Sequence, residues 1–207
     1  AKVRRRGVNP PVDESFAGPV IDSRLVWLNP PPVAHAGPEG LCVETAAHTD
    51  LWQGTHYGFR VDNAHALLAE IAGDFQLETW VEFHPRHQYD QAGLLVRLSS
   101  DCWLKTSIEF EPDGPSRLGS VVTNGGWSDW ATQDVPATLR RAHYRVTRRN
   151  GDYLVEFETA TDTWTQLRVA HLHDDNGQSR VYAGLYACSP KEAGFRAIFR
   201  RLRISAP

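Results

Sequence analysis

The most regular pattern of polar and apolar residues lies between Tyr89 and Glu109, where two segments alternate with a period of two. One set of alternate positions is largely apolar: Ala92, Leu94, Val96 and Leu98, then Leu104, Thr106, Ile108 and Phe110. The other set is Gln91, Gly93, Leu95 and Arg97, then Trp103, Lys105, Ser107 and Glu109. Side chains of a strand point alternately to opposite faces, so the pattern predicts a β-hairpin with one apolar face. The other face carries a cation, a carboxylate and an indole, and is the first candidate for a functional site.

Shorter alternating segments recur along the chain, separated by turn sequences such as Asn150-Gly151. They predict strands over residues 41–45, 75–83, 118–124, 143–147, 153–158, 164–169, 180–187 and 195–204. Two segments lack this alternation and are not predicted to be strands. Residues 64–72 have a helix-like composition and predict a short helix or a turn, and residues 127–137 predict a loop rich in aromatic and polar groups. Many short strands with almost no helix predict an all-β fold, a two-sheet antiparallel sandwich.

The composition of the chain indicates its domain number and limits the kinds of partner that it is expected to bind. The 207 residues, 41% of them hydrophobic, suffice for one domain, predicted over residues 15–207 after a flexible, basic N-terminal arm over residues 1–14. The net charge of −3 gives no reason to expect nucleic acid or an anionic membrane as a partner. No apolar run approaches the roughly 18 residues of a membrane span. Cys42, Cys102 and Cys188 are widely spaced, which is typical of reduced thiols and favours a cytoplasmic location.

Several ordered motifs resemble one family, the largely uncharacterised "regulation of enolase" type of concanavalin A-like domain. The motifs are DLW (50–52), HYGFRVDNAH (56–65), GDF (73–75), YDQAGLLVR (89–97), WLKTSIEF (103–110), SVVTN (120–124), SDW (128–130) and YACSP (186–190). The resemblance runs from about residue 15 to the end of the sequence. It implies a jelly-roll sandwich of the lectin and glucanase superfamily, with a ligand groove across the concave sheet. The family name reflects a regulatory role ascribed to a fungal member, which we do not transfer to this chain because fold alone does not carry function.

On such a jelly roll, we expect the polar faces of neighbouring strands to line one groove. Indole faces pack against the C–H surfaces of pyranose rings, while carboxylates, amides and guanidinium groups fix the directions of hydroxyls. The leading hypothesis is therefore binding of a carbohydrate or a similarly polyhydroxylated small molecule. The candidate ligand-binding residues are Trp80, His84, Tyr89, Asp90, Gln91, Arg97, Trp103, Ser120, Asn124, Asp129 and Trp130.

A solvated sheet face is the alternative interpretation of the same residues. Lys105 and Glu109 lie about 13 Å apart along one strand, so they do not pair directly. Each is expected to meet Glu82 or Arg97 of a neighbouring strand, and cross-strand charge pairs of this kind are common on exposed sheets.

An enzyme acting on a glycoside or a small metabolite is the second hypothesis, with Lys105, Glu109 and Glu82 as candidate catalytic residues. Glycoside hydrolysis needs two carboxyl groups about 5–9.5 Å apart, and Glu82 and Glu109 are the best pair if their strands are neighbours. Alternatively, Lys105 serves as a base or electrostatic stabiliser with Glu109 or His84 as proton partner, provided that burial lowers the lysine pKa. A cytoplasmic regulatory protein that binds no small ligand is the third hypothesis.

Two clusters contain residues of metal-ligand type, namely His84, His87 and Asp90, and then His171, His173, Asp174 and Asp175. Both lie at predicted strand ends or in loops, where such residues are ordinary, so no metal and no cofactor are predicted. Asp129 is expected to accept backbone N–H groups in a loop while Trp130 packs, and His65 is expected to be structural. The sequence does not indicate an oligomeric state.

Overall fold

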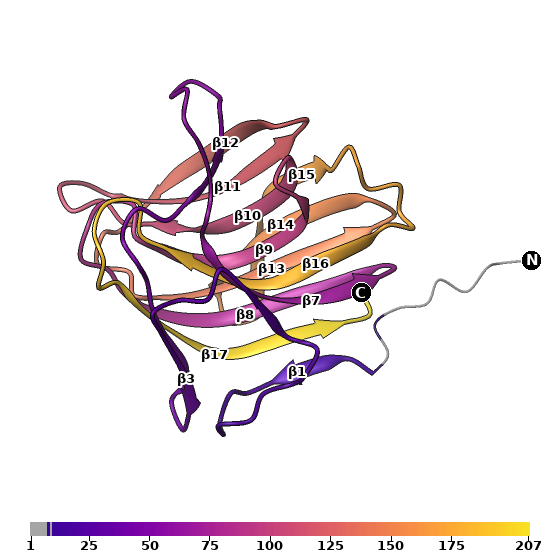
Figure 1. Cartoon of the computed structure of the whole chain (residues 1–207), viewed down its shortest axis with the longest axis horizontal. Coiled ribbons are helices and arrows are strands. Elements are labelled where there is room, and N and C mark those ends of the chain that lie inside the picture. Colours follow the sequence, from indigo (N-terminus) through magenta and orange to yellow (C-terminus); the bar gives the residue numbers. More distant parts are fainter. Residues whose placement is uncertain (1–7, 9) are drawn as a thin grey trace, which may run out of the picture.

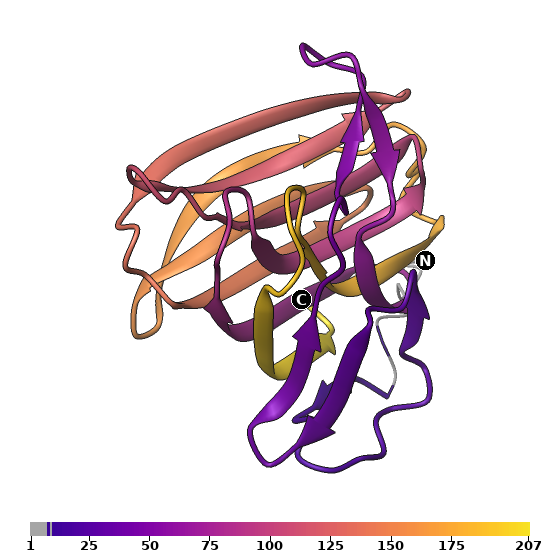
Figure 2. The same cartoon turned by 60° about the vertical axis from the view of Figure 1, so that its left-hand side comes forward.

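The computed structural model describes residue 8 and residues 10–207, and these residues form antiparallel β-sheets with no helix among them (Figures 1 and 2). The eight-stranded sheet contains, in spatial order, β15 (Thr163–His171), β14 (Asp152–Ala160), β13 (Arg141–Arg149), β8 (Phe75–His84), β17 (Arg196–Ser205), β4 (Gly40–Glu44) and β3 (Val33–Gly37), with β1 (Val12–Glu14) paired to β17. The seven-stranded sheet contains β12 (Trp127–Val135), β11 (Ser116–Asn124), β10 (Cys102–Glu109), β9 (Gln91–Ser99), β16 (Arg180–Cys188), β7 (His65–Ala72) and β2 (Val26–Leu28). A separate hairpin joins β5 (Leu51–Gln53) to β6 (Arg60–Asp62). The predicted two-sheet antiparallel sandwich is confirmed.

The main core lies between the two large sheets. Strand β8 contributes alternate residues such as Leu77 and Val81, and β9 contributes Leu94 and Val96 from its own inner face. A second, smaller cluster lies on the opposite face of the seven-stranded sheet and contains Leu51, Trp52, Ala64, Ala66, Leu68, Leu95, Trp103, Val121, Tyr186 and Cys188. The seven-stranded sheet is therefore covered by apolar side chains on both faces.

Strand β7 corrects the predicted helix over residues 64–72. Its inner face places Leu67, Ala69 and Ile71 in the main core, while Ala66 and Leu68 belong to the second cluster. A strand buried on both faces has no alternation of apolar and polar residues, so its composition does not distinguish it from a short helix. Tertiary packing overrides the local preference here.

Strand β12 corrects the loop predicted over residues 127–137. It is the edge of the seven-stranded sheet and pairs only with β11, in a continuous register from Asn124↔Trp127 to Ser116↔Val135. Most of its residues are solvent-exposed, so its sequence is largely polar although every residue is in register with β11. An edge strand of this kind lacks the apolar period that marks a buried one.

The predicted N-terminal arm, residues 1–14, falls partly outside the described residues, which exclude 1–7 and 9. Within the described part, Val12–Glu14 form β1 and pair with β17 in the register Val12↔Ile204. Val12 is buried, and the Asp13 carboxylate accepts hydrogen bonds from Arg201 at 2.7 and 2.8 Å. The arm boundary at residue 14 is therefore wrong for these three residues.

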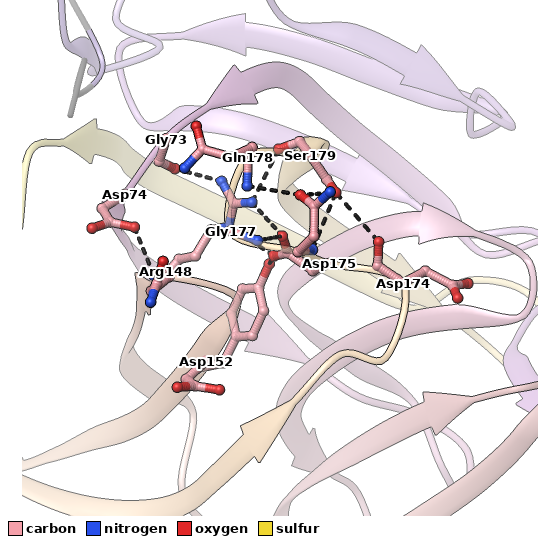
Figure 3. A network of polar contacts seen from close by, with 12 residues as sticks. Gly73, Asp74, Arg148, Asp152, Asp174, Asp175, Gly177, Gln178 and Ser179 are labelled. Atoms are coloured by element: carbon pink, nitrogen blue, oxygen red, sulfur yellow. Dashed lines mark hydrogen bonds and ion pairs between the residues drawn. The ribbon is translucent and has the colours of Figure 1, made fainter. Parts of the chain in front are cut away.

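A buried polar network closes the end of the sandwich beside the turn between β7 and β8 (Figure 3). Arg148 is fully buried; its Nε donates to Asp175 Oδ2 at 2.8 Å, and its Nη1 donates to the Gly73 carbonyl at 2.6 Å. The Tyr153 hydroxyl also donates to Asp175 Oδ2, at 2.6 Å. Burial alone would raise the pKa of Asp175, but the Arg148 and Tyr153 hydrogen bonds outweigh it and hold that pKa below its usual value. The network binds β13, β14 and the loop before β16 into one unit.

Asp175→Asn is expected to lower the free energy of unfolding by about 3 kcal/mol, because it leaves the buried Arg148 guanidinium without its counter-charge. The matched control is Glu70→Gln, which breaks the exposed Arg180–Glu70 pair and should cost less than about 1 kcal/mol. Urea unfolding of both variants measures the difference. Equal losses in the two variants would contradict a supporting role for the buried network.

Candidate functional site

A cavity of about 340 Å³ lies on the face of the seven-stranded sheet that points away from the main core. Strand β10 and the start of β9 form its floor, and the β5–β6 hairpin and β12 form its walls. The side chains around it include polar groups below and aromatic rings above: Asp50, Trp52, Tyr57, Phe59, Tyr89, Gln91, Lys105, Glu109, Val121, Trp130, Pro190 and Lys191.

Small residues on neighbouring strands let the polar floor sit deep in the sheet. Gly93 of β9 and Gly119 of β11 flank Ser107 of β10 in the strand register. A Cβ on Gly93 would lie 1.9 Å from the Thr106 carbonyl oxygen, so this close approach of two strands requires glycine. Tyr186 of β16 pairs with Gly93 in the register and belongs to the second apolar cluster, with Leu95 and Trp103.

Lys105 is the central polar group of the floor and is 3% exposed. Its Nζ donates to Asp50 Oδ1 at 3.0 Å and to Gln91 Oε1 at 3.1 Å. The same Gln91 oxygen accepts a hydrogen bond from the Tyr186 hydroxyl at 2.9 Å. Burial alone would lower the pKa of Lys105, but the Asp50 carboxylate outweighs it and holds that pKa above its usual value. Lys105 is therefore a fixed cation rather than a base, so the condition for a catalytic lysine base is not met.

Glu109 is the second ionisable group of the floor and is also buried. Burial raises its pKa to about 7, with the neighbouring Asp50 carboxylate adding to the rise. The Lys105 ammonium and a hydrogen bond from the Gln91 amide offset only part of it. At neutral pH this carboxyl exists in both protonation states, so it can donate a proton or accept one.

Asp50 is the partner of Lys105 that the sequence did not assign to the site. It precedes β5, and its backbone N–H donates to Asn63 Oδ1 at 3.0 Å, while its carbonyl accepts the Asn63 and Ala64 N–H groups, both at 3.1 Å. Asn63 lies in the HYGFRVDNAH motif and Asp50 in DLW. The DLW and HYGFRVDNAH motifs therefore form one structural unit. In the sequence, the only indication of this unit is that both motifs are present.

The walls of the pocket are aromatic. Trp52 lies 5.5 Å from Tyr57, 6.5 Å from Phe59 and 6.4 Å from Trp130, measured between ring centroids. Tyr89 lines the same space with its backbone at φ 72°, a conformation that bulky residues rarely adopt. Its carbonyl accepts a hydrogen bond from Gln91 Nε2 at 3.0 Å. The hydrogen bond from Gln91 thus stabilises the strained backbone at Tyr89 and also positions Gln91 in the pocket floor.

The predicted candidates Lys105, Glu109, Gln91, Tyr89 and Trp130 come together around this cavity. Trp103 lies beside them but is fully buried, with the Lys105 ammonium 5.9 Å from its ring centroid and its Nε1 donating to the Ser100 carbonyl. These placements make one pocket from residues of β9, β10 and β12.

Trp80, Glu82 and His84 do not reach the pocket, and the expectation that one groove joins them to β9–β11 is wrong. They lie on β8, which belongs to the eight-stranded sheet, on the face turned away from the core. Glu82 accepts from Arg200 at 3.1 Å, and this hydrogen bond lowers its pKa. Glu82 and Glu109 therefore cannot form a catalytic pair, because their strands belong to different sheets.

Ser120 and Asn124 lie on the face of β11 opposite to the pocket, since Ser120 pairs with Thr106 in the strand register. Asn124 instead accepts the His173 N–H at 2.8 Å and donates to the His171 carbonyl at 2.9 Å. Asp129 points away from the pocket as well, and its carboxylate accepts a hydrogen bond from Arg168 at 2.6 Å. The predicted groove assignment is wrong for these three residues.

Arg97 and Asp90 stabilise the structure around the pocket through an ion pair and hydrogen bonds. Arg97 lies on the pocket face of β9 but forms a two-pronged pair with Asp62, so the expected pairing with Lys105 or Glu109 is wrong. The buried Asp90 carboxylate accepts the Arg86 and His87 N–H groups at 2.8 and 2.9 Å and fixes the loop before β9. His65 is structural as expected, because its ring bonds to the Asn29 carbonyl and to the Ala46 N–H.

Among the described residues, no group of three or more His, Cys, Asp or Glu side chains is arranged to hold a metal ion. In the cluster of residues 171–175, the Asp175 carboxylate accepts a hydrogen bond from Arg148. Over the same part of the chain, no helix is long and apolar enough to cross a membrane.

The family described as "Protein of unknown function (DUF1349)" matches residues 27–207. The chain belongs to this family. "Regulation of enolase protein 1" of Saccharomyces cerevisiae is 33% identical over 185 residues, which cover 89% of this DUF1349 chain and 91% of the relative. A crystal structure of a functionally unknown protein from Saccharomyces cerevisiae matches with a TM-score of 0.81 and 32% identity over 89% of this chain and 97% of that one. The predicted family resemblance is confirmed.

A more distant structural match places the DUF1349 fold among the jelly-roll sandwiches. The GH43 protein BlXynB from Bacillus licheniformis matches with a TM-score of 0.73 and 14% identity, over 95% of this chain and 39% of that one. This chain thus spans about two fifths of that protein. At this identity the likeness shows the fold alone, and it confirms the predicted concanavalin A-like jelly roll.

Glu109→Gln is expected to remove a pH dependence from the folding stability. The Glu109 carboxyl has a pKa of 4.5 as an ordinary exposed group and about 7 when folded, so rising pH between these values stabilises the unfolded chain. As the pH rises over this range, the free energy of unfolding of the original protein should fall by roughly 2–3 kcal/mol relative to that of the variant. Above about pH 7 the difference between the two proteins should stay constant. Urea unfolding of both proteins between about pH 5 and pH 8 measures this. A difference that is constant with pH contradicts the burial of an ionisable carboxyl.

Proposed function

We propose that this chain binds a carbohydrate or a similarly polyhydroxylated small molecule in the pocket over β10. The observation that carries the proposal is a floor of ionisable groups, the buried Lys105 and Glu109 with the partly buried Asp50, beneath walls of aromatic rings. Taking charges out of water costs several kcal/mol for each ion, and apolar residues of similar size would stabilise the fold equally well or better. A ligand that needs these groups explains why they are present.

The floor has hydrogen-bonding capacity that suits hydroxyl groups. A lysine ammonium carries three N–H donors, and within the described residues Lys105 uses two of them, toward Asp50 and Gln91. Glu109 faces the same space and can donate or accept because its pKa is about 7. A hydroxyl both donates and accepts, so neighbouring hydroxyls of one ring can satisfy a floor that offers both kinds of group.

The walls and the volume suit one ring. A cavity of about 340 Å³ lies near the lower end of the range of roughly 300–1,000 Å³ found for small-molecule sites. Trp52 and Trp130 present large, rigid apolar surfaces that are suited to the C–H faces of a sugar. The names of several structural neighbours, such as the GH43 protein from Bacillus licheniformis, agree with this ligand class, but the pocket chemistry carries the proposal.

Acid–base catalysis in the same pocket is the second candidate. Glu109, with a pKa of about 7, is suited to proton transfer near neutral pH, and Asp50 takes the place of Glu82 as the second carboxylate. Lys105, held as a cation, would stabilise negative charge that develops on a reacting oxygen.

A cytoplasmic location is also proposed. Cys42, Cys102 and Cys188 are all free thiols, as is usual where glutathione keeps cysteines reduced. Absence of nucleic acid and membrane partners remains a prediction from the charge balance. A regulatory protein without a small ligand remains the third hypothesis.

Lys105→Met and Glu109→Gln are each expected to weaken sugar binding at least about tenfold, since each removes a polar group from the floor. The control is Glu82→Gln, which changes the same type of residue in the other sheet and should leave affinity unchanged. Calorimetric titration with a panel of neutral monosaccharides and disaccharides measures the effect. If no neutral sugar binds the original protein, or if both floor variants bind as it does, the proposed function is wrong.

If the pocket hydrolyses glycosides with Glu109 as general acid, the rate should fall as pH rises through about 7. Release of monosaccharide from a panel of disaccharides, whose alcohol leaving groups need a proton from the general acid, provides the measurement across this pH range. Glu109→Gln should abolish turnover, whereas Glu82→Gln should keep both the rate and the pH profile. Turnover that survives in Glu109→Gln would exclude this carboxyl as the acid.

A further inference from the structure

The hairpin between β5 and β6 carries two aromatic residues that belong to the pocket and also extend outside it. Tyr57 and Phe59 line the cavity, yet they are 54% and 47% exposed. Their rings stack on each other with centroids 6.0 Å apart and planes inclined by 29°. Figure 2 shows that the hairpin projects beyond the sheets. Because Tyr57 and Phe59 line the cavity and are also largely exposed, they belong to its mouth rather than to its buried floor.

Several contacts fix this hairpin in place. Inside it, Gly54 N donates to the Phe59 carbonyl and Gly58 N to the Gly54 carbonyl, both at 2.9 Å. Arg60 Nη1 donates to the Gly126 carbonyl at 2.7 Å and to Gln53 Oε1 at 3.0 Å, which ties the hairpin to the turn between β11 and β12. The pair of Asp62 with Arg97 anchors its base to β9. A rigid aromatic surface can bind a ring with little loss of conformational entropy.

The exposed aromatic pair has no evident task in holding the fold together. By contrast, the exposed Trp127 lies under the Arg60 guanidinium, 5.0 Å from its ring centroid, and so helps to anchor the hairpin. Tyr57 contacts Trp52 and His56, Phe59 contacts Trp52, and about half of each residue is exposed beside the cavity that both line.

We propose that Tyr57 and Phe59 form a second subsite, on which the next sugar ring stacks when the terminal ring of a glycan occupies the pocket. The proposal rests on the proposed carbohydrate-binding function and specifies the ligand as the end of an oligosaccharide rather than a free monosaccharide. Aromatic surfaces that continue outward from a one-ring pocket offer apolar contact to the following unit, whose other face remains in water.

The test compares affinities by calorimetric titration with glucose and cellobiose, xylose and xylobiose, and mannose and mannobiose. At least one disaccharide should bind about 3- to 10-fold more tightly than its monosaccharide, the gain expected from stacking one further ring. In the double variant Tyr57→Leu, Phe59→Leu, which keeps apolar contact with Trp52 but lacks flat rings, the affinity ratio should fall to about one. The ratio is the measurement because a general loss at the pocket weakens both sugars alike.

Tyr182→Leu is the matched control, because Tyr182 is also exposed but lies on β16 away from the pocket lining, and it should preserve the ratio. Monosaccharide binding without any gain for a disaccharide overturns the second subsite and leaves the proposed function standing. A gain that persists in the double variant also overturns it, since the second ring then stacks elsewhere. If neither sugar of any pair binds, the proposed function fails and the subsite with it.

Discussion

Burial of the seven-stranded sheet on both faces determines where the other parts of the molecule lie. One face packs against the eight-stranded sheet, and the other carries Leu68, Leu95 and Val121 beneath the β5–β6 hairpin. Because the hairpin, a small two-stranded sheet, covers part of that second face, the strands under it lose contact with water. The pocket is the part of this covered face that is left open, bounded by aromatic side chains and by β12 at the edge.

The covered face also explains the chemistry of the pocket floor. Lys105 and Glu109 lie on β10, where every residue is buried, so their charges interact in a medium much less polar than water. Asp50 comes from the chain just before the hairpin and meets Lys105 there. The group that keeps the lysine charged therefore belongs to the same segment that excludes water from it, and the cover and the charge balance depend on each other.

Much of the fold could be predicted because apolar residues recur with a period of two in several strands, as in β8 and β14, where buried and less buried positions alternate. The hairpin of β9 and β10 was predicted from the same period in its sequence, although every residue of β10 is buried. The family was predicted from its ordered motifs. The pattern fails where alternation is absent: β7 is apolar on both faces, and β12 carries polar and apolar residues on both. On β11, Leu118 and Val122 share a face with Ser120, and the polar residues at 120 and 124 concealed that this face packs inward. Strand order is not encoded in any single strand, so nothing local could separate Glu82 from Glu109 or bring Asp50 to Lys105.

The position of the last two strands has a consequence for synthesis of the chain. Strand β17 lies between β8 and β4, and β16 lies between β9 and β7, so each large sheet is completed by a strand from the C-terminal end of the sequence. Until both strands have left the ribosome, β4 and β7 each lack the strand that joins them to the rest of their sheet. The chain must therefore keep two half-built sheets from pairing wrongly during translation, and insertion of β16 and β17, rather than formation of the early hairpins, completes the two sheets.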